Sequence, residues 1–173
     1  MTFKLDSLFE SAEKPYLDAN ALTMLSQYVS SIPERIAVYR ILRDQEIAIM
    51  QPIADALQQR TQEPEAKVER SVRHGLMALR YVAMAMLLDD SAFVEGRLQG
   101  WLPEMVQAHE TQALDQQLFQ LLEQQLAKVL TPAQMNLLKP GMTKARDLML
   151  GHASPAPVPA AAVPELDPLA GLL

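Results

Sequence analysis

The chain has 173 residues, a formal net charge of −6 and no cysteine. This length predicts one domain with a terminal tail, and the acidic balance argues against nucleic acid as a general partner. The missing cysteine excludes disulfides, thiolate nucleophiles, cysteine–zinc sites and any thioether-linked cofactor.

The first part of the chain predicts helices. Apolar residues recur three and four positions apart throughout, which is typical of an all-α fold, and we expect seven or eight helices. A short helix is expected over about 4–13, ending before Pro15. A second one follows Asp18, whose side chain suits an N-cap.

The next two helices are long. Pro33 suits a first helical turn, so we expect it to open a helix that reaches about Gln59. Pro52 lies inside this pattern and should kink or divide the helix near Gln51. A polar link, RTQEPEA, then precedes a helix over 65–88.

The remaining helices are shorter. A cap at Asp90 or Ser91 opens the first of them. The others are expected over 103–109, over 113–129, and from Pro132, after a cap at Thr131, to about Leu150. Pro140 predicts a bend or break in the last helix.

Residues 151–173 differ in character from the rest. They are rich in Pro and Ala without periodicity, which predicts an extended, flexible tail leaning toward polyproline. The final stretch, ELDPLAGLL, could be a short docking motif or a plain terminus. The N-terminus lacks a signal-peptide pattern and no apolar run is long enough to span a membrane, so we expect a cytoplasmic, soluble protein.

The helix over 65–88 has two unlike faces. One side is apolar and predicts a core stripe, with Gly75 allowing close approach of a neighbour. The other side combines guanidinium groups, an imidazole, a phenol and thioethers, at Arg70, Arg73, His74, Met77, Arg80, Tyr81 and Met84. Such a face could hold a flat apolar molecule that carries carboxylates.

Other interpretations of this face are open. Arginines on a helix commonly lie over apolar surface with their charged ends in water, as a solvated face or a partner interface. A single histidine such as His74 is commonly a structural residue. Glu46, Asp55 and Glu69 have the spacing of solvated faces, and no catalytic constellation stands out, so we expect no enzyme activity.

The segment SVRHGLMALRYVAMAMLLDDSAFVEGRLQGWLPEM resembles the central part of phycobiliproteins, the bilin-carrying antenna proteins of cyanobacteria. PYLDANALTMLSQYV and IAVYRILRDQEIAIMQPIADAL resemble earlier helices of that family, and NLLKPGMTKARDLML lies where its closing helix belongs. The resemblance covers about residues 3–150 and implies a globin-like, phycocyanin-like fold. It implies a domain over 1–150, with a helical hairpin at 1–31 and a globin core at 32–150. In the family the hairpin makes the dimer contact, so a homodimer is expected.

The resemblance also implies site residues. Ser71 takes the place of the attachment cysteine, Arg73 that of the arginine that binds a bilin propionate, and His74 that of an aspartate that binds pyrrole nitrogens. Lys67 falls where the family has another basic residue. Because Ser71 cannot form a thioether, a covalent bilin is excluded. Reversible bilin binding by Arg73 and His74, with Arg70, Arg80, Tyr81 and Met77, is the expected function.

The chain resembles the cysteine-free bilin-biosynthesis-associated globins, so its reversible bilin binding is expected to serve bilin metabolism. The alternative is a ligand-free assembly or regulatory protein of the phycobilisome system, acting on partner proteins through its dimer surface and tail. Haem binding through His109 is the less favoured option, because VQAHETQ looks like a polar helix end.

Overall fold

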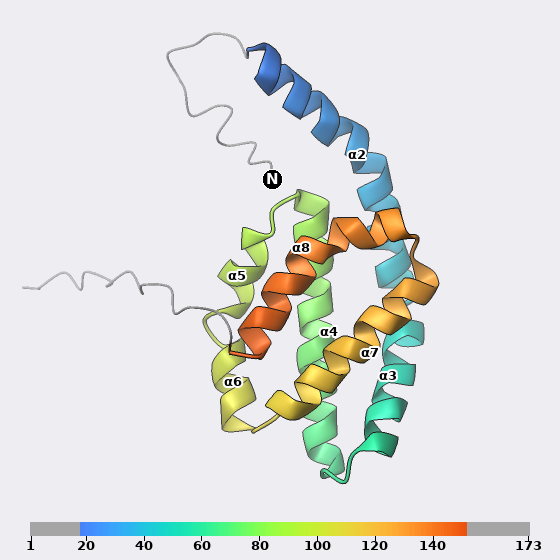
Figure 1. Cartoon of the computed structure of the whole chain (residues 1–173), viewed down its shortest axis with the longest axis vertical. Helices are drawn as coiled ribbons and strands as arrows, with labels where there is room; N and C mark the ends of the chain where they lie inside the picture. Colours follow the sequence, from blue (N-terminus) through green and yellow to red (C-terminus); the bar gives the residue numbers. More distant parts are fainter. Residues whose placement is uncertain (1–17, 152–173) are drawn as a thin grey trace, which may run out of the picture.

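The computed structural model describes residues 18–151, and this part of the chain contains seven α-helices and no strand. Figure 1 shows their course, in order α2 (Ala19–Asp44), α3 (Glu46–Arg60), α4 (Glu65–Leu88), α5 (Ala92–Leu98), α6 (Leu102–Ala108), α7 (Gln112–Val129) and α8 (Pro132–Met149). The all-α prediction is confirmed. The helix predicted over 4–13 and the tail after Gly151 lie outside the described residues.

Several helix boundaries follow the local signals in the sequence. The Asp18 side chain accepts a hydrogen bond from the Ala21 backbone N–H at 2.8 Å, which caps α2. α4 has the bounds predicted for it. Thr131 and Gln134 form a reciprocal capping box at the start of α8. Asp90, by accepting from the Ala92 N–H, supports the start of α5.

The prediction that Pro33 opens a helix is wrong, and so is the prediction that the chain divides near Gln51. α2 runs through Pro33 and across the expected 31/32 boundary, and the division comes instead at Gln45. Pro33, Pro52 and Pro140 are all exposed, and so are the residues four positions before each of them. The carbonyls that the prolines leave without a helical partner can therefore bond to water, which lets the helices continue. α8 likewise continues through Pro140, and it changes direction along its length, as predicted (Figure 1).

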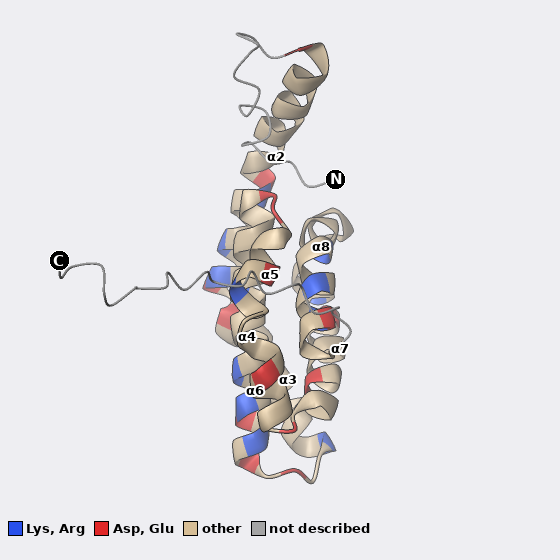
Figure 2. Ribbon diagram, turned by 90° about the vertical axis from the view of Figure 1, so that its left-hand side faces the viewer, with Lys and Arg blue, Asp and Glu red and all other residues tan. Residues whose placement is uncertain are grey.

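α4 is the centre of the fold and packs against α2, α3, α5, α7 and α8. Figure 2 shows α7 and α8 on one side of α4. The largest fully buried side chains are aliphatic, among them Ile53, Leu57, Leu98, Leu118 and Leu122. Burial of these residues between α4 and its neighbours supplies the main stabilisation of the domain.

At Gly75, α4 packs tightly against Leu118 of α7. A Cβ atom at this position would lie 2.3 Å from Cδ2 and 3.1 Å from Cγ of the fully buried Leu118. The predicted close approach at Gly75 is confirmed. A larger residue at this position would fit only if the Leu118 side chain moved.

We therefore expect Gly75→Ala to lower the free energy of unfolding by about 1–3 kcal/mol, because the added methyl group overpacks the helix contact. Gly96→Ala is the matched control, since a Cβ there meets no atom within 4 Å. It should leave stability unchanged or raise it by up to about 1 kcal/mol. Denaturant unfolding of both variants measures the difference, and equal effects would mean that the Gly75 contact is not tight.

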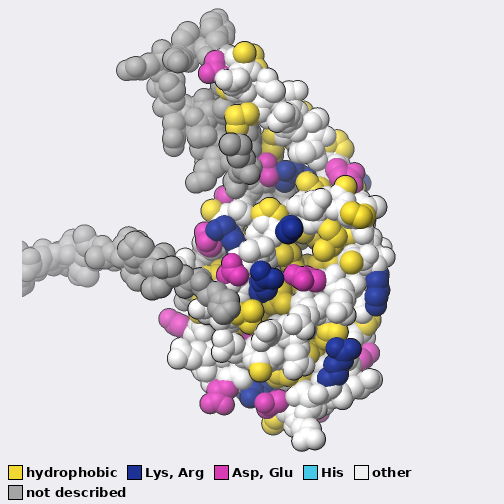
Figure 3. Space-filling model, viewed as in Figure 1, with side chains coloured by type: hydrophobic (Ala, Val, Ile, Leu, Met, Phe, Trp, Pro, Cys, Tyr) yellow, Lys and Arg dark blue, Asp and Glu magenta, His cyan; other side chains and the backbone are white. Residues whose placement is uncertain are grey.

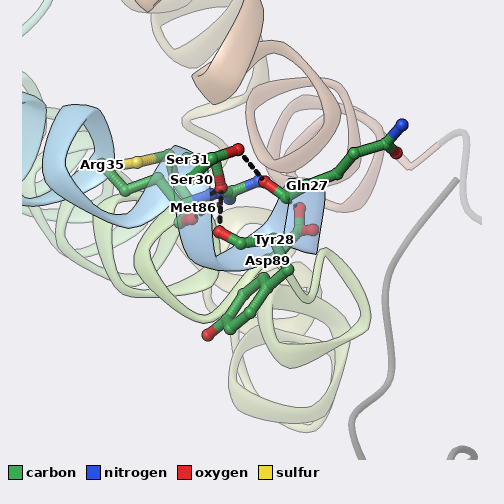
Figure 4. A network of polar contacts seen from close by, with 7 residues as sticks. All are labelled: Gln27, Tyr28, Ser30, Ser31, Arg35, Met86 and Asp89. Atoms are coloured by element: carbon green, nitrogen blue, oxygen red, sulfur yellow. Dashed lines mark hydrogen bonds and ion pairs between the residues drawn. The ribbon is translucent and has the colours of Figure 1, made fainter. Parts of the chain in front are cut away.

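Arg35 joins α2 to the end of α4, as Figure 4 shows. It is only 7% exposed, and its guanidinium donates to the Met86 carbonyl, to Ser31 Oγ at 2.9 Å and to the Asp89 carboxylate at 2.7 Å. Asp89 has φ 54°, the left-handed conformation that ends α4. The part of α2 before this contact contains no buried residue, and it extends beyond the other helices (Figure 1).

Candidate functional site

The outer face of α4 carries the arginines singled out from the sequence. Arg70, Arg73 and Arg80 are all exposed. Figure 2 shows several Lys and Arg positions along the edge of the molecule that faces away from α7 and α8. Arg73 pairs with Glu69 one turn earlier, with 2.5 Å between Nη2 and Oε1. These side chains form a surface rather than an enclosed site.

Arg80 lies at a cleft between α2, α3 and α4. The cleft has a volume of about 230 Å³ and is lined by Tyr39, Leu42, Arg43, Glu46, Leu79, Arg80, Ala83 and Met84. Arg80 donates to both carboxylate oxygens of Glu46, at 2.7 and 3.0 Å. This hydrogen bonding raises the pKa of Arg80 above its ordinary value, so the guanidinium stays charged. The cleft therefore combines an apolar floor with a rim of fixed charge.

Ser71 and His74 point the other way, into the protein. Ser71 is completely buried, and its hydroxyl donates to Asp115 Oδ1 at 2.5 Å. Thr111, at the start of α7, donates to Asp115 Oδ2 at 2.7 Å. His74 is 8% exposed, its Nδ1 lies 3.9 Å from Asp115 Oδ2, and Nδ1 has no hydrogen-bond partner in the part of the chain described. The two α4 residues are thus part of a buried polar cluster.

The cluster contains a serine, a histidine and an aspartate, yet it lacks the order of a catalytic triad. Such a triad needs the serine hydroxyl to donate to the imidazole and the imidazole to donate to the carboxylate. Here the serine donates directly to Asp115, which is itself fully buried. The arrangement fixes α4 to the start of α7, and it does not activate a nucleophile.

The structure thus separates the predicted site residues, some on the outer face of α4 and others in the protein interior. Lys67 pairs with Glu63, with 3.1 Å between charged atoms. Tyr81 is half-buried, and its ring centroid lies 6.4 Å from that of Phe93. Met77 is half-buried as well. Arg70, Arg73 and Arg80 therefore remain on the outer face of α4, whereas His74 faces the interior.

His109, the residue considered for haem, follows α6 and lies against His74. The two imidazole centroids are 6.5 Å apart and their planes differ by 23°, a stacked arrangement. Within residues 18–151 no group of three or more His, Cys, Asp or Glu side chains is placed to hold a metal ion. None of the helices described is long and apolar enough to cross a membrane.

Sequence reasoning missed five residues that matter to these two sites. Asp115 and Thr111 complete the buried cluster, and Tyr39, Leu42 and Arg43 line the cleft. One signal for Asp115 was available, because it lies on the same helical face as Leu118 and Leu122 and so occupies a core position. The cleft gave no such signal, since it depends on how α2 and α3 meet α4.

Comparison with known proteins identifies a family. The family model described as "Phycobilisome protein" matches residues 10–145, which is well over half of the chain. No curated protein matches the chain significantly.

Proposed function

The chain belongs to the phycobilisome protein family, and we propose that it is a cytoplasmic, non-enzymatic assembly member of the phycobilisome system that carries no covalent bilin and pairs with a second copy through α2. The absence of cysteine supports the first part of this proposal, since a thioether to a bilin needs a thiol. The burial of Ser71 adds to it, because the position that resembles the attachment site is closed off by Asp115.

The observation that carries the proposal is an apolar stripe on α2 that we call the α2 seam. Its residues recur at alternating spacings of three and four, the pattern of a helix that packs along another helix. They are Leu22, Leu25, Val29, Ile32, Ile36 and Tyr39. Leu22 is 53% exposed and Val29 is 54% exposed. Figure 3 shows apolar side chains along α2 where it extends beyond the body.

An exposed seam of this kind favours an isologous dimer. The seam spans about 26 Å of helix, long enough for two α2 helices to pack side by side. Two copies related by a two-fold axis would cover each other's seam, which removes large aliphatic groups from water. Arg35 supports this geometry because it fixes the direction in which α2 leaves the body.

Sedimentation velocity over a range of concentrations tests the proposal directly. We expect a reversible monomer–dimer equilibrium. A monomer at every concentration would refute self-association.

A second function, reversible bilin binding, is favoured by a different observation. Arg70 and Arg73 are exposed one turn apart on α4, and in the described part of the chain Arg70 has no ion-pair partner. Guanidinium groups can bind propionates bidentately, and the neighbouring Met77 offers a polarisable apolar surface to pyrrole rings. Bilin would then lie along the outer face of α4, without a covalent bond and without a contact to the buried His74.

For this second function we expect Arg73→Ala to weaken bilin binding by about 1.5–3 kcal/mol, because it removes a charged hydrogen bond to a propionate. That loss corresponds to a roughly 10- to 150-fold higher Kd. Absorption titration with biliverdin and phycocyanobilin measures it. Arg60→Ala, at the exposed end of α3, is the control. Equal losses in both variants would indicate diffuse electrostatic attraction rather than a site.

A further inference from the structure

The cleft between α2, α3 and α4 has features that neither proposed function uses. Its floor is aliphatic, since Leu42, Leu79 and Ala83 line it, and Met84 at its edge is 41% exposed. Arg43 and Arg80 stand at its rim. The site is therefore suited to a peptide that alternates aliphatic side chains with carboxylates.

The rim arginines retain hydrogen-bonding capacity. Arg80 uses two N–H groups on Glu46, and Arg43 donates through Nε to Asp44 at 2.8 Å. A guanidinium carries five N–H groups. No other acceptor contacts either guanidinium within residues 18–151. Each guanidinium can therefore donate to a further carboxylate while it keeps its present partner.

The chain itself contains a segment with the matching chemistry. Residues 165–173, ELDPLAGLL, carry two carboxylates within three residues and four leucines in nine. The preceding residues, 152–164, contain no acidic or basic side chain other than His152. The negative charge of the tail is thus concentrated next to its leucines, where it matches the unused N–H groups of the two rim arginines beside the apolar floor.

The extended tail has a reach comparable with the length of the body. The thirteen residues 152–164 span about 40 Å as a polyproline helix. α4, which runs the length of the body, has 24 residues and measures roughly 36 Å. Because the motif is tethered, its effective concentration at the cleft is in the millimolar range, so modest contacts suffice for docking.

We propose that residues 165–173 dock into the cleft of their own chain, with the Glu165 and Asp167 carboxylates on Arg43 and Arg80 and with leucines over Leu42, Leu79 and Met84. Any other protein that uses the cleft must first displace this segment. Tyr39 belongs to both the α2 seam and the cleft, but the contacts assigned to residues 165–173 are all with residues outside the seam.

Disulfide formation in the full-length chain tests this docking, because the chain has no cysteine of its own. One variant carries Met84→Cys with Leu169→Cys, and its control carries Met105→Cys with Leu169→Cys. Met84 and Met105 are similarly exposed, at 41% and 38%. Met105 lies on α6, which packs against α8, so an undocked tail reaches it at least as easily. The rates of thiol loss and the masses of the products are measured.

We expect the disulfide within one chain to form roughly tenfold faster at Met84→Cys than at Met105→Cys. The Glu165→Lys/Asp167→Lys reversal and high salt should both slow the reaction at Met84→Cys alone. Equal rates at the two positions would overturn the proposal. A product at Met84→Cys that links only two different chains would also overturn it, since the occupant would then be a second copy. Sedimentation of the parent chain reports the α2 dimer separately, so the two failures are distinguishable.

Discussion

Asp115→Ala is expected to lower the free energy of unfolding by about 2–5 kcal/mol. The substitution removes the acceptor of both the Ser71 and the Thr111 hydroxyl, and each of these residues is completely buried. Two buried hydroxyls without partners and a small cavity account for the loss. Because the cluster connects α4 to the start of α7, the effect should appear as a lower Tm, by about 2–4 °C for each kcal/mol.

Two further variants separate the loss of hydrogen bonds from other causes. Asp115→Asn keeps the shape of the side chain and one acceptor oxygen. It should therefore lower the free energy of unfolding clearly less than Asp115→Ala does. Asp147→Ala, on α8, removes a carboxylate whose side chain is 40% exposed and whose closest cation is 3.9 Å away. It should change stability by less than about 0.5 kcal/mol. Similar losses for Asp115→Ala and Asp147→Ala would contradict the structural role of the cluster.

Local signals in the sequence were sufficient to predict most helix ends, but they did not predict that the helices continue through Pro33 and Pro52. Asp18 and Thr131 cap helices through contacts within a few residues, which a sequence pattern contains. Pro33 and Pro52 look like breaks because the sequence does not show which face of a helix meets water. In the folded chain both are exposed, and the carbonyls without helical partners can be solvated.

The candidate site was predictable only in part, and the reason is again the direction of side chains. The helical wheel placed Arg73 and His74 on one broad face, although they are separated by one residue step of about 100°. That step is enough for Arg73 to stay in water while His74 turns toward Asp115. Asp115 lies 41 positions further along the chain than His74, so no local pattern could identify their proximity.

The buried Arg35 illustrates a second limit of sequence reasoning. An arginine within an ordinary helical pattern is expected to be exposed, yet Arg35 binds the Met86 carbonyl, which lies 51 positions away. This contact depends on the left-handed turn at Asp89, which supplies both an acceptor and a change of direction. Only the three-dimensional arrangement explains why the first half of α2 is held away from the body.

The double variant Leu22→Glu/Val29→Glu is expected to abolish dimer formation, with the dissociation constant raised by at least about 100-fold. Both residues lie on the α2 seam two turns apart, so a dimer would bury four carboxylates without partners. Glutamate is a good helix former, so α2 itself should persist. Sedimentation velocity measures the change.

Ile47→Glu is the matched control, since Ile47 is an 81% exposed aliphatic residue on α3 and is not part of the seam. It should leave both the dimer and the Tm unchanged. The Tm of the double variant, measured at concentrations where the parent is monomeric, shows whether the seam packs against a second copy or within its own chain. An unchanged Tm with a lost dimer assigns the seam to a second copy. A lowered Tm under these conditions would instead mean that the seam packs within its own chain, and the dimer proposal would fall.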